Sequence, residues 1–119
     1  MSPIIESGFS LLTFDFSGSG ISDGEYVSLG WYESMDVQSV VESVRTRSEV
    51  GNIYLWGRSM GGATSIIYAS WDHSIKAILV DSVYSNMNKL AIELGKKMIK
   101  LPSFILSAFM HFIRKSIKK

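Results

Sequence analysis

Residues 57–61 of this chain read Gly-Arg-Ser-Met-Gly, a G-x-S-x-G pattern centred on Ser59. In such a pattern the serine lies on a sharp turn between a strand and a helix, so that its hydroxyl projects above a sheet. The flanking Gly57 and Gly61 remove side chains that would collide in that turn. The spacing therefore predicts a nucleophilic serine that attacks a carbonyl carbon, with the backbone N–H of Met60 donating to the oxyanion.

The sequence around this pattern supplies the strand and the helix that such a turn requires. An apolar run over residues 52–57 predicts a strand directly before Ser59, and small residues open a helix predicted from Gly61 to Ser70. The alternative reading is a structural serine in a tight turn, since five letters alone are a weak signal in a chain with ten glycines. The strand-turn-helix context favours the nucleophile.

The other predicted elements complete an α/β pattern. An apolar run of strand formers at residues 10–15, an amphipathic periodicity at 31–48 and a third apolar run at 76–81 predict a strand, a helix and a strand. With the strand and helix around Ser59, the order is β-α-β-α-β. Helical connections of this length imply parallel strands, right-handed crossovers and helices on both faces of the sheet.

Two further helices are predicted after the last strand, over residues 86–100 and 103–117, with Pro102 between them. Charge is divided unevenly, because residues 1–50 hold two basic and eight acidic side chains whereas residues 96–119 hold seven basic and none acidic. The basic end could bind an anionic membrane or protein surface. The alternative is that it faces the acidic start of the chain or solvent.

Composition narrows the class of protein and of site. A chain of 119 residues with 46% hydrophobic and 19% charged residues is typical of a soluble globular domain. The absence of cysteine excludes disulfides, zinc-thiolate sites and a cysteine nucleophile. Because the start lacks a basic region and carries Glu6, we expect no secretory signal and a cytoplasmic location, with membrane association through the basic end as an option. The apolar stretch Leu101 to Ile113 is too short to span a bilayer.

No cofactor, metal or nucleic-acid site is predicted. The glycine loop around Gly18 and Gly20 continues to Asp23 and Gly24 and lacks the third glycine of a dinucleotide fingerprint, and no Walker lysine follows it. The tryptophans are spaced among predicted core elements, which favours packing over base stacking. The expected partner is a small acyl, ester or peptide substrate.

Three ordered motifs resemble the α/β-hydrolase superfamily. Residues 14–22 are similar to the FD-x-x-G-x-G-x-S signature that precedes the serine turn, residues 55–62 resemble the turn of the serine-aminopeptidase-like branch, and residues 78–84 resemble its next strand. The resemblance covers about residues 8–85. It implies a partial α/β-hydrolase fold, with a catalytic serine at the carboxyl edge of the sheet, an aspartate after a later strand and a histidine near the end of the domain.

The resemblance also implies how the chain is organised and what it does. We expect a single, incomplete α/β-hydrolase domain over residues 1–119, with a core at 8–85 and a helical lid or connection at 86–119. The implied function is a serine hydrolase acting through Ser59 on an ester, thioester or amide carbonyl, in a truncated form that lacks the catalytic acid and base. The alternative is a non-catalytic fragment or interaction module that binds through its basic amphipathic tail.

Three residues come into question as substitutes for the missing acid and base. Asp81 ends a predicted strand, where capping of the following loop is the favoured role. His73 is expected in the turn after the Ser59 helix, remote from the hydroxyl. His111 has the right chain order but lies in an apolar helical stretch, which favours packing or surface exposure. The sequence thus offers Ser59 and the Met60 N–H without a convincing base.

Overall fold

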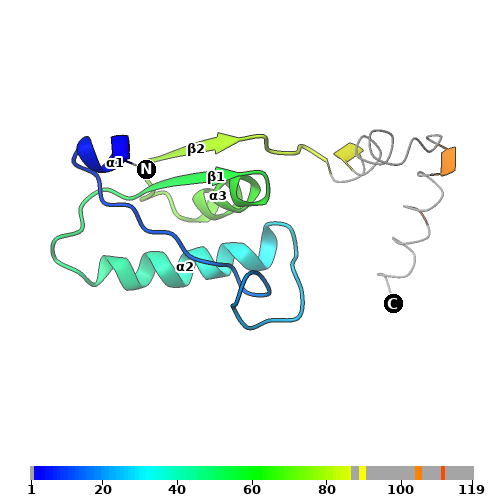
Figure 1. Ribbon diagram of the computed structural model, residues 1–119, viewed down its shortest axis with the longest axis horizontal. Coiled ribbons are helices and arrows are strands. Elements are labelled where there is room, and N and C mark those ends of the chain that lie inside the picture. Colours follow the sequence, from blue (N-terminus) through cyan, green and yellow to red (C-terminus); the bar gives the residue numbers. More distant parts are fainter. Residues whose placement is uncertain (1, 87–88, 91–103, 106–110, 112–119) are drawn as a thin grey trace. The chain divides into compact units, whose positions relative to one another are not determined.

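The computed structural model describes residues 2–86, 89–90, 104–105 and 111. The chain forms two compact units, residues 1–81 and residues 82–119. The first unit contains three helices and two strands, namely α1 (Ser2–Glu6), α2 (Trp31–Arg45), β1 (Tyr54–Arg58), α3 (Met60–Trp71) and β2 (Ala77–Asp81) (Figure 1). The helices expected at 86–100 and 103–117 fall largely outside the described residues.

The two strands form a parallel pair joined by α3, which confirms the predicted β-α-β crossover. Tyr54 pairs with Ala77 at one end of the ladder and Arg58 pairs with Asp81 at the other. The strands lie within two residues of their predicted limits. Both strands end at the same edge, where the chain leaves β1 directly into α3.

One face of this small sheet carries the core. Since side chains alternate along a strand and paired residues of parallel strands share a face, Leu55 and Ile78 point to one side and Trp56 and Leu79 to the other. Helix α3 packs on both strands, and α2 packs on α3 (Figure 1). The core that results is small and joins these elements, with buried Val37, Val41 and Tyr68 contacted by Phe16, Ile53, Leu55 and Ile75.

The expectation of helices on both faces is wrong for the first unit. Tyr54, Trp56 and Leu79 lie on the face opposite to α3, and they are 47%, 63% and 60% exposed. Helices α2 and α3 share the other face, because Leu55 packs against the cluster that both helices form. The described part of the first unit therefore leaves an apolar sheet face uncovered.

The expected strand at residues 10–15 is also wrong. These residues have no regular secondary structure and are exposed, and the only strands in the described part of the chain are β1 and β2. The segment is fixed at its ends by side chains instead of a ladder: the Phe9 ring contacts Tyr54 edge-on with centroids 5.7 Å apart, and the Ser17 N–H donates to Asp36 at 2.8 Å. A run of strand formers becomes a strand only where its backbone groups find a partner strand.

One helix boundary differs from expectation, and one helix was not predicted. Helix α2 ends at Arg45 instead of residue 48, because Thr46 and Arg47 donate to carbonyls three residues back, which tightens the last turn. Helix α1 had no sequence signal beyond Pro3 in its first turn, and it is only five residues long. Neither difference changes the position of the turn between β1 and α3.

Candidate active site

The turn from β1 into α3 places Ser59 in an unusual backbone conformation. Ser59 is exposed and precedes the first helical residue, with φ 52° and ψ −114°. Its N–H donates to the carbonyl oxygen of Asp81 at 2.8 Å, and its carbonyl accepts from Ala63 at 3.1 Å. A positive φ is rare for a residue with a side chain and costs free energy, so the neighbouring strand and helix must hold it.

Only one of the two flanking glycines is needed to make room for this turn. The expectation that a side chain at Gly61 would collide is wrong, because a Cβ built there meets no heavy atom within 4 Å. Gly57 is buried at the end of β1, and a Cβ there would overlap the carbonyl of Gly61 and the N–H of Gly62. The N–H groups of Met60, Gly61 and Gly62 belong to the first turn of α3, where a helix has no acceptor of its own for them. Donors at a helix start, aided by the helix dipole, suit a negatively charged oxygen.

Asp81 lies beside this turn, but its backbone carbonyl and its carboxylate both have partners other than the Ser59 hydroxyl. Its backbone carbonyl accepts from Ser59, and its carboxylate oxygen Oδ2 lies 3.3 Å from Nε of Arg58. The two side chains are 59% and 79% exposed, and the strand register places them on the same face. Asp81 therefore ties the carboxyl ends of β1 and β2 together through its backbone and pairs with Arg58 through its side chain.

Neither histidine is brought to Ser59 within the first unit. His73 is the only histidine of residues 1–81, and it follows the far end of α3. A twelve-residue helix is about 18 Å long, so His73 is remote from the Ser59 hydroxyl. His111 is exposed and helical and belongs to the second unit.

The first turn of α2 carries a buried carboxylate that was not predicted from the sequence. Glu33 is 1% exposed, and its oxygens accept from the Ser28 N–H at 2.8 Å, the Ser28 hydroxyl at 2.6 Å and the Gly30 N–H at 2.7 Å. Glu33 is the third residue of α2, so this is a capping arrangement at the helix start. The signal that could have found it is a Glu at the third position of the predicted helix, from where its side chain can reach back to the N–H of the residue before the helix, Gly30.

Hydrogen bonding controls the ionisation of Glu33. Burial alone raises its pKa, but the hydrogen bonds from Ser28, its own N–H and Gly30 together hold that pKa below the ordinary value of 4.5. The carboxylate is therefore charged at neutral pH and fixes the loop at residues 28–30.

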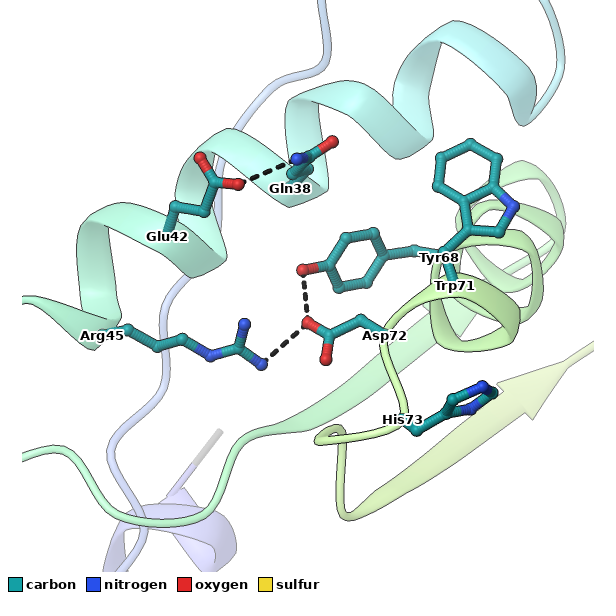
Figure 2. A pocket seen from close by; sticks show the side chains of 7 residues that line it. All are labelled: Gln38, Glu42, Arg45, Tyr68, Trp71, Asp72 and His73. Atoms are coloured by element: carbon teal, nitrogen blue, oxygen red, sulfur yellow. Dashed lines mark hydrogen bonds and ion pairs between the residues drawn. The ribbon is translucent and has the colours of Figure 1, made fainter.

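A polar cavity of about 250 Å³ lies at the opposite end of α3 from Ser59 (Figure 2). Its side chains bind one another: Asp72 accepts from the Tyr68 hydroxyl at 2.6 Å and from Arg45 at 2.7 Å. Burial, followed by the hydrogen bond to Asp72, raises the pKa of Tyr68 to about 12. The hydrogen bond from Tyr68, followed by those from Ser74, holds the pKa of Asp72 well below its usual range. This cluster joins α2 to the end of α3.

The described residues offer neither a metal-binding cluster nor a membrane-spanning helix. Within the described residues, no group of three or more His, Cys, Asp or Glu side chains is arranged to hold a metal ion. In the same part of the chain, no helix combines the length and the apolar character needed to cross a membrane.

Several bacterial proteins are similar to this chain. An uncharacterized 31.7 kDa protein from the traX-finO intergenic region of Escherichia coli is 33% identical over 84 residues, which are 68% of this chain and 29% of that protein. The uncharacterized protein YfhR of Escherichia coli K12 is 32% identical over 90 residues, 72% of this chain and 31% of YfhR. The uncharacterized protein YqkD of Bacillus subtilis is 33% identical over 66 residues, 55% of this chain and 22% of YqkD.

These matches concern only part of each relative. The chain spans about three tenths of the length of the first two curated relatives, and no solved structure matches it. The family comparison covers nearly the whole chain, because residues 1–114 match the alpha/beta hydrolase fold family. Together with the parallel β-α-β unit and the turn at Ser59, this match shows that the chain belongs to the α/β hydrolase fold family.

Proposed function

We propose that this chain is the nucleophile-bearing part of a serine hydrolase of the serine-aminopeptidase-like branch, and that Ser59 is the nucleophile. The observation that carries the proposal is the positive φ of Ser59 at the junction of β1 and α3. Strained backbone persists where the surrounding structure holds it, and in this fold family a serine at such a turn presents its hydroxyl above the sheet.

The proposed reaction is transfer of an acyl group to Ser59. A bond forms between Oγ and the carbonyl carbon of an ester, thioester or amide, the bond to the leaving oxygen, sulfur or nitrogen breaks, and the hydroxyl proton ends on the leaving group. Water then releases the acid and restores the hydroxyl. The Met60 N–H, at the start of α3, is the proposed donor to the oxyanion.

The extent of activity is part of the proposal. Proton removal by a general base contributes on the order of 10²–10⁴-fold to such reactions, and Asp81 is paired with Arg58 while His73 is about a helix length away. We therefore propose that the 119 residues alone turn over slowly. The rival idea of a basic tail that binds an anionic surface concerns residues 96–119, of which the structure describes only 104–105 and 111, and it stays a prediction.

The nucleophile is tested by labelling with a fluorophosphonate, which reacts with activated serines. This chain, or a longer protein that contains it, is expected to form one adduct on the peptide that carries Ser59, and Ser59→Ala should abolish it. Ser70→Ala removes another exposed hydroxyl, at the far end of α3, and should leave the adduct unchanged. A folded longer protein that forms no adduct, or an adduct that survives Ser59→Ala, would overturn the proposal.

A further inference from the structure

Three apolar side chains are exposed together in the loop before α2. Tyr26 is 77% exposed, Val27 42% and Leu29 41%. Single exposed apolar residues are ordinary, but a run of them beside a candidate site is typical of a surface that binds an apolar group. The position of this loop relative to Ser59 decides whether it serves that site.

The end of the loop, at Gly30, lies against the first two turns of α3, the helix that begins directly after Ser59. A Cβ built on Gly30 would lie 3.6 Å from Cβ of Ala63 and 3.0 Å from Cδ1 of Ile67. Ala63 is itself the residue whose N–H donates to the carbonyl of Ser59. The start of α2 and the carboxyl end of β1 accordingly lie at the same end of the first unit (Figure 1).

The backbone of this loop is fixed. Leu29 has φ 62° and Gly30 φ 132°, and the buried carboxylate of Glu33 accepts hydrogen bonds from the residues on both sides of Leu29. A positive φ at a residue with a side chain costs free energy, and such strained residues are found mostly at functional sites. Fixed walls bind ligands better than mobile ones, because less conformational freedom is lost on binding.

We infer that residues 26–29 form the apolar wall of the acyl-binding side of the Ser59 site. The substrate class that follows is esters or thioesters of medium or long apolar acyl groups, in preference to acetyl or charged ones. This inference rests on the proposed function, since it assigns a substrate class to the same serine. The wall itself does not require the serine to react, and that difference allows the two ideas to be tested apart.

Binding without reaction is the first test. In Ser59→Ala protein with labelled methyl groups, methyl octanoate is expected to shift the NMR signals of the Leu29 and Val27 methyl groups. Methyl acetate at the same concentration should shift them less. The Ile5 methyl groups are the internal control, because Ile5 is 61% exposed on α1, and the Phe9–Tyr54 contact places that end of the chain at the start of β1, away from Ser59. Equal shifts with both esters, or larger shifts at Ile5, would overturn the inference.

Selectivity in labelling is the second test. The ratio of labelling rates for an octyl over an ethyl fluorophosphonate is expected to fall about tenfold in Leu29→Asn, in the range that a lost apolar contact gives. Asparagine tolerates positive φ, so the variant should keep the loop conformation. Ile5→Asn is the matched control and should keep the ratio.

The results separate the two ideas. A ratio unchanged by Leu29→Asn overturns the inference and leaves the nucleophile standing. Absence of all labelling in a folded longer protein that contains this chain overturns the proposed function, and the methyl shifts in Ser59→Ala protein then decide whether the wall binds an acyl chain.

Discussion

Ser59 and Gly57 together allow the sharp turn between β1 and α3. The chain must pass from the end of β1 into α3 within one residue, and Ser59 takes the positive φ that this requires while Gly57 leaves space for the carbonyl of Gly61. The strain at Ser59 is of the order of 1–3 kcal/mol for such backbone conformations. It is offset locally by the hydrogen bonds that Ser59 makes with Asp81 and Ala63.

This arrangement predicts that Gly57→Ala is severely destabilising. The added methyl group would meet backbone atoms of Gly61 and Gly62, which can move only if the start of α3 moves. We expect the free energy of unfolding to fall by more than about 3 kcal/mol, measured by urea denaturation. Gly51→Ala is the control, because a Cβ at Gly51 has no heavy atom within 4 Å. A loss as small as that of Gly51→Ala would contradict this account of the turn.

At the scale of single residues, the sequence predicted those features of the site that depend on residues close together in the chain. The turn at Ser59 was predicted from the residues on either side of it. The pairing of Asp81 with Arg58 was not, because it depends on the strand register, which only the folded sheet sets. Glu33 was missed although its bonds are local, since its burial depends on how the loop folds over α3.

At the scale of elements, α2 and α3 are joined by a few buried apolar side chains and by the polar cluster around Asp72. Val37 and Val41 of α2 pack against Tyr68 of α3. The hydroxyl of the same tyrosine donates to Asp72, which also pairs with Arg45 of α2. The contacts that hold α2 against α3 thus include two titratable groups, Tyr68 and Asp72.

The cluster predicts how stability depends on pH. Because the pKa of Asp72 is lowered in the folded chain, its contribution is present above the ordinary value of 3.8 and is lost as pH falls below it. Because the pKa of Tyr68 is raised to about 12, its contribution is present below the ordinary value of 10.0 and is lost as pH rises from there.

Urea midpoints measured across pH check both statements. Asp72→Asn should lower stability at neutral pH and flatten the acid loss, and Tyr68→Phe should flatten the alkaline loss. Asp23→Asn, at an exposed loop position, serves as the control and should leave the profile unchanged. An acid loss as steep in Asp72→Asn as in the unmodified chain would show that another carboxylate is responsible.

The sequence predicted four of the five elements of the first unit, namely α2, β1, α3 and β2. Periodicity and apolar runs suffice for these because each buries a face against a neighbour that the chain itself supplies. Residues 10–15 have the same apolar character but pair with no strand among the described residues, and α1 is too short to show a period. The local sequence pattern indicates which secondary structure a segment can form. Whether the segment forms it depends on a neighbouring strand or helix to pack against.

At the scale of the whole molecule, the chain holds a small part of what its relatives contain. It spans about three tenths of the length of the first two curated relatives. Within the described part of the first unit, the sheet face with Tyr54, Trp56 and Leu79 has no helix over it. Parallel sheets in α/β proteins are ordinarily covered on both faces, so this face is the place where further protein would pack.

The exposed face predicts that the 119-residue chain self-associates in solution. Burying Trp56 and Leu79, which are 63% and 60% exposed, is favourable in proportion to the apolar area removed from water. Sedimentation velocity should show a mass that rises with protein concentration. Replacing both residues by lysine should restore a monomer without lowering the urea midpoint, since neither side chain packs in the core. Ile5→Lys, on α1, is the matched control and should associate as the unmodified chain does. Association that persists in the double variant would place the contact elsewhere.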